Sequence, residues 1–275
     1  MRTNYRRFVD PASGYATWGI IPRADADRLE VLSDAPWREG AAPTGAMCPI
    51  AGLTFLAPAE PTKIVALAYN YRDLFADAGA VSGGSVATYT DPGFEPLVFL
   101  KGPHSLAHPG ARIALPAQGE ETWVEVEVAA VIGRRAKALP SRDAAADAIF
   151  GLTIGNDVTS LNVLDRDWHL ARSKARDAYC PLGPALVRGL DDGDLAMRTA
   201  ISGRVTQDSS SRHRILDTLE SVRFVSSLMT LEPGDVVLTG TPAGARQSVV
   251  RAGDRVEMSV EGLGTLECSF TLALN

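Results

Sequence analysis

The sequence is short of histidine, cysteine and net positive charge, and each shortage argues against a class of function. Its 275 residues include four histidines and three cysteines, and it has no HExxH motif and no CxxC pair. A structural or catalytic zinc site is therefore disfavoured. Three distant cysteines, an odd number, favour a reduced, cytoplasmic setting. The formal net charge of -6 argues against a nucleic-acid partner, which would need a basic surface.

Several other signals are missing. No run approaches the roughly 18 apolar residues of a membrane span, and the start MRTNYRRFVD lacks the apolar segment of a signal peptide. The sequence therefore predicts no membrane partner. GxGxxG, GxxxxGK[ST] and GxSxG motifs are absent as well, which disfavours nucleotide binding and serine-hydrolase chemistry. Hydrophobic residues at 45% and charged residues at 22% are ordinary for a globular protein.

The pattern of short apolar runs predicts a mixed, β-rich α+β fold. Three runs separated by turn-forming residues, within residues 6–34, are typical of a small N-terminal β module. Residues 41–63 are rich in proline, alanine and glycine, which predicts a linker. We therefore expect a module over residues 1–58 and a main domain over residues 59–275. Further strands are predicted in the main domain, within these ranges: 63–71, 97–102, 111–116, 122–133, 151–157, 233–244, 253–260 and 264–274.

Two segments have the pattern of helices. Residues 141–150 begin with Ser141 as a candidate N-cap and stop before Gly151, and residues 216–230 have apolar positions at helical spacing. Between the predicted strands, residues 79–93 form a glycine- and serine-rich loop that is long for a simple connection. Loops of this kind often act as lids.

Two glutamates on one predicted strand are the first candidates for chemistry. Glu125 and Glu127 alternate with valines in WVEVEV, so their side chains share one face, about 6–7 Å apart along the strand. Oxygen ligands without histidine or thiolate favour Mg²⁺, Mn²⁺ or Ca²⁺. Such charges are also normal on a solvated strand face. A third carboxylate, Asp157, ends the strand GLTIGND, where it could equally be a turn residue.

The order of several motifs resembles the fumarylacetoacetate hydrolase family. They read VEVEVAAVIG, GNDVTS, SKARDAYCPLGP and EPGDVVLTGTPAG, and the match runs from about Lys63 to the C-terminus. The small N-terminal module is also similar to those of members of about this length. The resemblance implies a catalytic fold of mixed β-sheets with short helices, and a homodimer.

The resemblance also implies roles for individual residues. Glu125, Glu127 and Asp157 match the metal ligands of the family, usually for Mg²⁺ or Mn²⁺, and Lys174 matches a lysine near the metal. Thr241 and Gly240, in TGTPAG, match positions that line the pocket or let the backbone approach the ligand. Asn70 and Tyr71 match the NY that opens the lid segment. Tyr71 is therefore expected near the substrate, and charge alone suggests Arg72 and Lys101 as anchors for a substrate carboxylate.

These residues predict a metal-dependent enzyme that acts on a small 2-oxo or 2,4-dioxo acid. A metal bound to the carboxylate and keto oxygens can stabilise an enolate, which serves carbon–carbon hydrolysis, decarboxylation and keto–enol transfer alike. We expect carbon–carbon cleavage by hydrolysis or decarboxylation. A tautomerase or isomerase on the same site, and a family member that binds metal and ligand without turnover, are the alternatives.

The chain departs from the family pattern at the lid. Many members have a histidine and a glutamate there, which activate water; Leu74 and Asp77 stand at those positions. Leucine cannot take up a proton, so hydrolysis is weakened relative to decarboxylation and tautomerisation. Members often read NDVSARDxQ, whereas Leu161, Asn162 and Leu164 replace the arginine, aspartate and glutamine here, which makes the pocket more apolar. His104 or His108 could supply a replacement base, although both are typical of surface histidines.

Overall fold

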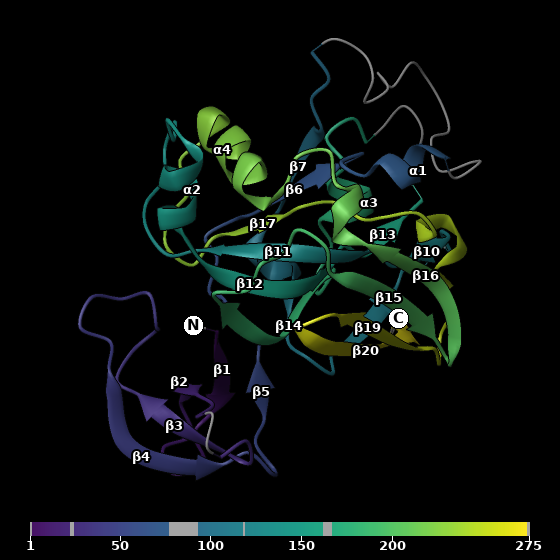
Figure 1. Cartoon of the computed structure of the whole chain (residues 1–275). Coiled ribbons are helices and arrows are strands. Elements are labelled where there is room, and N and C mark those ends of the chain that lie inside the picture. The colour runs from purple at the N-terminus through teal and green to yellow at the C-terminus, as the bar shows by residue number, and fades with distance from the viewer. Residues whose placement is uncertain (1, 23–24, 77–92, 118, 162–166, 274–275) are drawn as a thin grey trace.

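The structure, a computed structural model, describes residues 2–22, 25–76, 93–117, 119–161 and 167–273. Most of the predicted lid loop, 79–92, lies outside these residues, as do Asp77, Asn162 and Leu164. The mixed, β-rich prediction is confirmed, since the described residues form three sheets and a few short helices (Figure 1). Within the described segments, no helix is long and apolar enough to cross a membrane.

The largest sheet has twelve strands and mixes parallel with antiparallel pairs. Its main path is β4 (Pro43–Pro49), β3 (Arg28–Leu32), β2 (Ala16–Ile20), β1 (Thr3–Val9), β14 (Cys180–Arg188), β12 (Ile149–Asn156), β11 (Val126–Ile132), β17 (Val236–Leu238), β6 (Ile64–Ala68) and β7 (Leu97–Lys101). Off this path, β5 (Phe55–Leu56) pairs with β1 and β8 (Leu106–Ala107) pairs with β14.

Two smaller sheets complete the main body. A three-stranded sheet has the order β13 (Thr159–Ser160), β10 (Thr122–Trp123) and β18 (Val249–Val250). A five-stranded sheet has the order β16 (Arg204–Ser210), β15 (Ala196–Ile201), β19 (Arg255–Val260), β20 (Gly264–Leu272) and β9 (Arg112–Leu115). The sequence pattern predicts no strand over β14, β15 or β16. In β16, six of the seven residues are polar, so a prediction based on apolar runs misses this strand.

The first five strands lie together below the main body in Figure 1. The predicted linker over residues 41–63 is wrong in part, because this segment contains β4, which pairs with β3, and β5. Exposed side chains along β4 explain why its sequence has no apolar alternation. The module is joined to the main body by hydrogen bonds between β1 and β14. A boundary after residue 58 stays a prediction.

In the described segments, four α-helices and three 3-10 turns accompany the sheets. The helices are α1 (Arg72–Ala76), α2 (Arg142–Ala148), α3 (Ala171–Lys174) and α4 (Thr218–Leu228), and the turns are η1 (Pro103–Ser105), η2 (Ser211–His213) and η3 (Ala245–Gln247). Ser141 caps α2 as predicted, since its hydroxyl accepts a hydrogen bond from the N–H of Ala144. The helix ends at Ala148 rather than at residue 150, because β12 already begins at Ile149.

The amphipathic prediction for α4 is confirmed in its centre. The carboxylate of Asp217 caps the helix, and Val222 and Val225 are buried. Leu228, expected on the same apolar face, is 52% exposed because it lies at the C-terminal end. In Figure 1, α2 and α4 lie side by side over one end of the large sheet, where Arg142 of α2 forms ion pairs with Asp217 and with Glu220 of α4.

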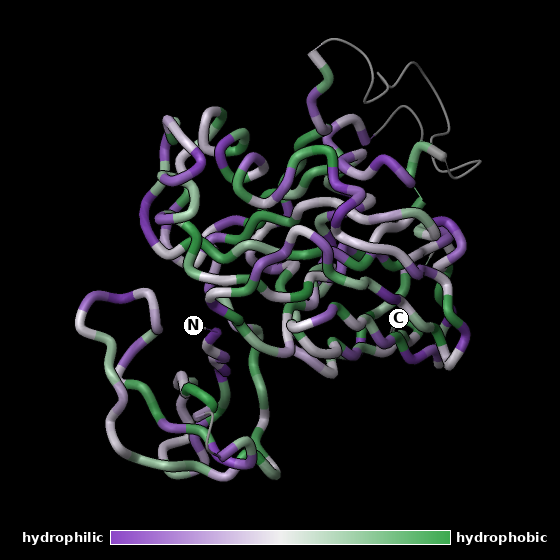
Figure 2. Tube along the Cα trace, in the orientation of Figure 1, coloured by the Kyte–Doolittle hydropathy of each residue, from purple (hydrophilic) through white to green (hydrophobic). Residues whose placement is uncertain are grey.

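Strand β11 runs through the middle of the core and is buried on both faces. Val126, Val128, Ala130 and Ile132 contact one hydrophobic cluster, while Ala129 and Val131 contact the other. The hydropathy trace shows mainly apolar segments crossing the main body and hydrophilic ones at its outer loops (Figure 2). A carboxylate on this strand is therefore far from an ordinary solvated position.

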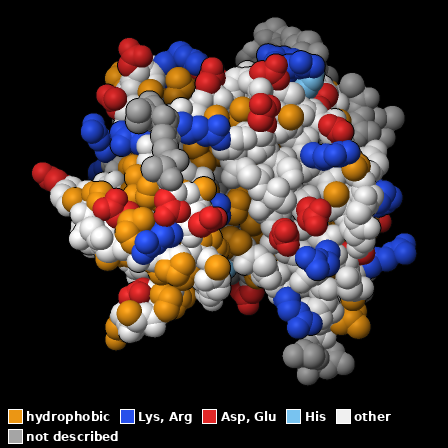
Figure 3. Space-filling view, turned by 60° about the horizontal axis from the view of Figure 1, so that its bottom comes forward, with side chains coloured by type: hydrophobic (Ala, Val, Ile, Leu, Met, Phe, Trp, Pro, Cys, Tyr) orange, Lys and Arg blue, Asp and Glu red, His pale blue; other side chains and the backbone are white. Residues whose placement is uncertain are grey.

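Charges of both signs are mixed on the face shown in Figure 3, where lysines and arginines alternate with aspartates and glutamates. That face therefore has no continuous basic surface. The absence of a nucleic-acid partner stays a prediction from the net charge.

Candidate active site

The three candidate metal ligands meet where two neighbouring strands of the large sheet begin and end. Glu127 is the second residue of β11, and Asp157 directly follows the last residue of β12, its antiparallel neighbour. Glu125 lies just before β11, where the chain crosses over from β10, so the single predicted strand over 122–133 is two strands. The N–H of Asp157 donates a 3.0 Å hydrogen bond to the carbonyl of Glu125, which fixes the crossing.

The side-chain oxygens of Glu125, Glu127 and Asp157 gather at one point, within 4.8 Å of one another, and all three residues are buried. One oxygen of Glu125 accepts hydrogen bonds from the indole N–H of Trp123 at 2.6 Å and from the hydroxyl of Thr159 at 3.2 Å. An oxygen of Glu127 accepts one from the backbone N–H of Gly240 at 2.5 Å. These donors orient the carboxylates before any cation binds.

Two buried lysines lie against the same cluster. The Nζ of Lys174 is 2.9 Å from Oε2 of Glu125 and 2.7 Å from Oδ2 of Asp157. The Nζ of Lys101 is 2.6 Å from Oδ1 of Asp157, an ion pair that lacks the geometry of a directed hydrogen bond. Three carboxylates therefore face two ammonium groups, and one negative charge is left over.

Lys174 is held in place by the short helix α3, of which it is the last residue. The carboxylate of Asp167 accepts hydrogen bonds from the backbone N–H groups of Arg172 and Ser173 and so fixes the first turn. Leu170, directly before the helix, has a positive φ of 58°, so the chain turns sharply at the start of α3. A polar residue upstream thus positions the lysine, a role that the motif SKARD alone does not reveal.

Burial and neighbouring charges shift the pKa values of these groups in different directions. Burial raises the pKa of Glu127 well above its ordinary value, and Asp157 and Glu125 raise it further. Burial also raises the pKa of Glu125, against the effect of Lys174. Burial alone would raise the pKa of Asp157, but Lys101 and Lys174 outweigh it and hold that pKa low. Burial alone would lower the pKa of Lys174, but Asp157 and Glu125 outweigh it and raise that pKa.

This donor set fits a hard divalent cation. Its ligand atoms are all carboxylate oxygens, which Mg²⁺, Mn²⁺ and Ca²⁺ prefer, and no histidine or cysteine belongs to the cluster. The excess negative charge, buried and close-packed, is costly unless a cation balances it. Glu125, Glu127 and Asp157 are therefore the residues that would hold the metal.

Metal affinity should depend on pH in a direction that Glu127 sets. Its raised pKa means that the metal-free folded protein keeps a proton there above the ordinary value of 4.5. The proton stabilises the metal-free fold at low pH, and this stability is lost as the pH rises through the raised pKa. Because the metal binds only the ionised carboxylate, its affinity rises over the same interval.

Calorimetric titration of Mg²⁺ or Mn²⁺ at about pH 5.5 and about pH 7.5 measures this, with tighter binding and less proton release expected at the higher pH. Equal affinity at both values would mean that the cluster ionises as readily as exposed carboxylates do.

A cavity of about 590 Å³ opens over the carboxylate cluster. Its wall contains Glu125, Glu127, Asp157, Lys174 and Thr241. Apolar side chains cover much of the remainder: Leu67, Ala68, Leu74, Leu97, Leu161, Leu170 and Ala245. The cavity therefore presents a charged floor and an apolar wall, a combination suited to a small acid.

Four other predicted site residues are not among those that line this cavity: Tyr71, Arg72, Lys101 and Gly240. The hydroxyl of Tyr71 is fully buried and donates to Sδ of Met197, while the guanidinium of Arg72 donates to a backbone carbonyl, that of Arg214. Asn70 likewise binds backbone groups, at Leu216 and Thr239. These side chains bind neighbouring parts of the fold rather than facing the cavity.

Gly240 acts through its backbone. Its φ is +93°, and a Cβ there would lie 3.0 Å from Cβ of Asn70 and 3.1 Å from the carbonyl oxygen of Leu67. Only glycine allows this close approach without strain. The approach brings the N–H of Gly240 to Glu127, so the glycine serves a metal ligand directly. Thr241 follows it, and its hydroxyl accepts a 3.0 Å hydrogen bond from the amide of Gln207.

Lys101, predicted from its charge as a substrate anchor, is fully enclosed. Beside Asp157, its ammonium donates to the carbonyl of Val158 at 3.2 Å, to that of Tyr179 at 2.9 Å, and to that of Lys174. An ammonium at 0% exposure cannot meet a substrate in this conformation. We infer that it positions Asp157 and the backbone around Lys174.

Lys101→Met should destabilise the metal-free protein by about 3–5 kcal/mol, because Asp157 loses a partner and buried carbonyls lose a donor. Urea unfolding with chelator present measures this free energy. Lys137→Met, at an exposed lysine, is the matched control and should change it by no more than about 0.5 kcal/mol. A loss no larger than the control's would show that Lys101 is not needed to hold the cluster.

Several residues of the site were not predicted. Trp123 and Thr159 hold Glu125, and Tyr69, rather than its neighbour Tyr71, lines the cavity. Arg246 also lines it, just beyond the TGTPAG motif. Trp123 lies next to the ExE motif and could have been considered from the sequence. Thr159, Tyr69 and Arg246 come from distant segments, which only the folded chain brings to the site.

Leu74 lines the cavity at the position where many family members have histidine. The chain contains four histidines, all in the described segments, and none lines this cavity. His104 contacts the carbonyl of Ala175, and His108 accepts a hydrogen bond from the N–H of Ala57. Both histidines bind backbone groups away from the cavity. This agrees with the sequence analysis, which favoured ordinary surface histidines over a replacement base.

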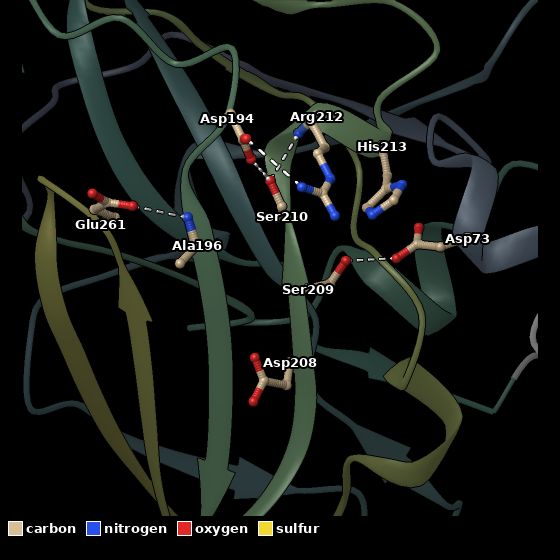
Figure 4. A pocket seen from close by; sticks show the side chains of 9 residues that line it. All are labelled: Asp73, Asp194, Ala196, Asp208, Ser209, Ser210, Arg212, His213 and Glu261. Carbon is tan, nitrogen blue, oxygen red and sulfur yellow. Dashed lines mark hydrogen bonds and ion pairs between the residues drawn. The ribbon is translucent and has the colours of Figure 1, made fainter.

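A second cavity, of about 550 Å³, is open and polar (Figure 4). Its wall comprises Asp73, Asp194, Ala196, Asp208, Ser209, Ser210, Arg212, His213 and Glu261. Its side chains bind one another, as when the hydroxyl of Ser209 donates to Asp73 at 2.6 Å. It has no buried cluster of ionisable groups like the one beneath the first cavity, so the first is the candidate active site.

Comparison with known proteins agrees with the motif resemblance. The sequence profile described as fumarylacetoacetate (FAA) hydrolase C-terminal matches residues 63–271. Protein Rv2993c of Mycobacterium tuberculosis is 38% identical over 226 residues, which cover 81% of this chain and 80% of that protein. The mitochondrial oxaloacetate tautomerase FAHD2B of Homo sapiens is 34% identical over 269 residues, covering 92% of this chain and 76% of that protein.

Among solved structures, 5-carboxymethyl-2-hydroxymuconate delta-isomerase from Mycobacterium smegmatis superposes with a TM-score of 0.85 at 34% identity. The alignment covers 99% of this chain and 100% of that one, so the N-terminal strands are included.

Proposed function

The chain belongs to the fumarylacetoacetate hydrolase family, and from that premise we propose that it is a divalent-metal-dependent enzyme that interconverts keto and enol forms of a small 2-oxo or 2,4-dioxo acid. The proposal also includes Mg²⁺ or Mn²⁺ as the metal, a cytoplasmic setting and a homodimer.

The observation that carries the choice of reaction is the composition of the cavity wall. It combines three carboxylates and an ammonium with Leu74, and no histidine lines it. Hydrolysis of a carbon–carbon bond needs a base that activates water as a nucleophile, whereas tautomerisation only exchanges protons between the substrate and its surroundings. In tautomerisation one proton leaves the carbon beside the carbonyl and one joins the oxygen, so no water is consumed. Two of the similar proteins carry the names of a tautomerase and an isomerase.

The chain's own residues would bind the substrate and stabilise its charge. Lys174 presents its ammonium beside two of the carboxylates, where it would stabilise negative charge on a substrate oxygen. Thr241 lies in the same wall, with its hydroxyl oriented by Gln207. Leu67, Leu74 and Leu97 would exclude bulk water, which strengthens these electrostatic interactions. A divalent cation on Glu125, Glu127 and Asp157 would supply a Lewis acid for the carboxylate and keto oxygens of the acid.

Decarboxylation is the second candidate. Loss of CO₂ from a 3-carboxylated 2-oxo acid leaves negative charge beside the carbonyl, which the same ammonium would stabilise, and it also needs no activated water. Hydrolytic cleavage, expected together with decarboxylation from the motifs, is disfavoured by Leu74 for the reason given above.

Proton NMR of oxaloacetate in D₂O separates these reactions. With metal-loaded protein we expect deuterium to enter the carbon beside the carbonyl faster than in the metal-only control, with CO₂ release at the control rate. Faster CO₂ release with pyruvate as the product would favour the decarboxylase instead. No acceleration of either process with oxaloacetate or with acylpyruvates would contradict the proposed function.

A further inference from the structure

Arg246 brings a second cationic group to the cavity, and an indole connects it to the carboxylate cluster. Its guanidinium carbon lies 4.4 Å from the ring centroid of Trp123, a cation–π contact. The N–H of the same indole donates to Glu125 at 2.6 Å. Arg246 therefore lies across one aromatic ring from a candidate metal ligand, on the same cavity wall.

The guanidinium of Arg246 is positioned by an aromatic ring, but no described residue neutralises its charge. Within the described part of the chain, Arg246 forms no ion pair and no side-chain hydrogen bond, and its contact with Trp123 holds it over an aromatic face. Two other arginines differ in this respect, since Arg176 pairs with Glu120 at 3.3 Å and Arg214 with Asp192 at 2.9 Å. A guanidinium has five N–H donors that suit the two oxygens of a carboxylate.

The charges around the cavity leave room for two negative charges. The wall carries three carboxylates against Lys174 and Arg246, and Lys101 lies behind Asp157. These charges balance, so a divalent cation in the cluster would leave an excess of two positive charges. A monocarboxylic substrate would neutralise half of that excess, while a dicarboxylic substrate would neutralise all of it.

The described residues of the remaining wall offer no other anchor for a second carboxylate. Apart from Lys174 and Arg246, the described residues lining the cavity include no cationic side chain, and Leu161 stands where the family pattern often has arginine. Lys174 is already engaged by Glu125 and Asp157. Of the described cationic side chains in the wall, Arg246 is therefore the one available to bind a carboxylate at the far end of the substrate.

We propose that Arg246 is a specificity-determining residue that binds the second carboxylate of a 2-oxo dicarboxylic acid whose 2-oxo acid end lies at the carboxylate cluster. The inference rests on the proposed function, because it places the substrate's 2-oxo acid end at the metal. It adds the substrate class: small dicarboxylates rather than monocarboxylic oxo acids.

Binding to the Mg²⁺-loaded protein tests this with a readout other than the rate of turnover, and 2-oxoglutarate provides a second dicarboxylate beside oxaloacetate. Calorimetry would compare two dicarboxylates, oxaloacetate and 2-oxoglutarate, with the matched monocarboxylates 2-oxobutyrate and 2-oxovalerate. We expect at least one dicarboxylate to bind about 10- to 100-fold more tightly than its matched acid, the usual effect of a charge-assisted hydrogen bond. In Arg246→Gln that preference should disappear while the affinity for the monocarboxylates changes by less than about threefold.

Arg246→Lys should keep part of the preference, because a point charge replaces the forked donor. Arg251→Gln, at an exposed arginine close by in the sequence, is the matched control and should keep all of it. The Mg²⁺ affinity of each variant, measured in the same way, reports whether the cluster is still folded.

The outcomes separate the two proposals. An equal loss of affinity for mono- and dicarboxylates in Arg246→Gln, or no preference in the unmodified protein, would overturn the role of Arg246 while leaving the proposed function standing. Failure of every 2-oxo acid to bind the metal-loaded protein would overturn both.

Discussion

Glu127→Gln is expected to lower metal affinity by at least about 100-fold and to abolish metal-dependent turnover at ordinary metal concentrations. Residues that only orient metal ligands typically change affinity by about 10- to 100-fold, so a direct ligand should have at least that effect. Glu127 accepts the N–H of Gly240 and lies within 4.8 Å of the other two ligand groups. Glutamine preserves the shape and the hydrogen bond but not the charge.

The same substitution should stabilise the metal-free protein at neutral pH. Burial and the neighbouring carboxylates raise the pKa of Glu127, so its ionised form is costly in the fold, and a neutral amide removes that cost. Thermal unfolding in chelator and calorimetric metal titration together measure both effects. Glu121→Gln, at an exposed glutamate, is the matched control and should change neither. Lower metal-free stability combined with unchanged metal affinity would show that Glu127 has a structural role only.

Lys174→Met should reduce turnover by about 100- to 1,000-fold, the usual effect of removing one group that stabilises developing negative charge. Metal affinity should be retained or increase, because the ammonium that shares Glu125 and Asp157 with the cation is gone. The result would separate charge stabilisation from metal binding, which Glu127→Gln cannot do.

The measurement is kcat and KM on the best substrate of the oxo-acid panel at saturating metal, alongside a metal titration of the same preparation. Lys137→Met supplies the exposed-lysine control. A Lys174→Met protein that turns over at the unmodified rate, or that loses metal as Glu127→Gln does, would contradict the role assigned to Lys174.

The carboxylate cluster could be predicted from the sequence because its members lie in short motifs. Glu125 and Glu127 alternate with buried valines, Asp157 ends a strand, and the motif order supplied the family and hence Lys174. The structure brings all four together. The alternating pattern predicted one continuous strand through Glu125, and this is wrong. Hydrogen bonds from Glu125 to neighbouring elements separate β10 from β11 at this residue.

Charge alone was a poor guide to the substrate-facing residues. Lys101 and Arg72 carry the positive charge that a substrate carboxylate needs. However, the ammonium of Lys101 is enclosed by backbone carbonyls, and the guanidinium of Arg72 donates to the carbonyl of Arg214. Arg246 was not considered, since its position over Trp123 depends on the turn after Gly244. Contacts between residues distant in sequence decide which charges reach a cavity, and no local pattern encodes them.

A divalent cation held by Glu125, Glu127 and Asp157 would make this chain an enzyme of oxo-acid chemistry. The most direct test follows the ultraviolet absorbance of enol oxaloacetate while metal-free protein is titrated with Mg²⁺ or Mn²⁺, with cation occupancy measured on the same samples. We predict that the protein-dependent rate rises in proportion to occupancy and is lost with chelator and in Glu127→Gln. A full rate in chelator, or full occupancy with no rate above the metal-only control, would contradict it.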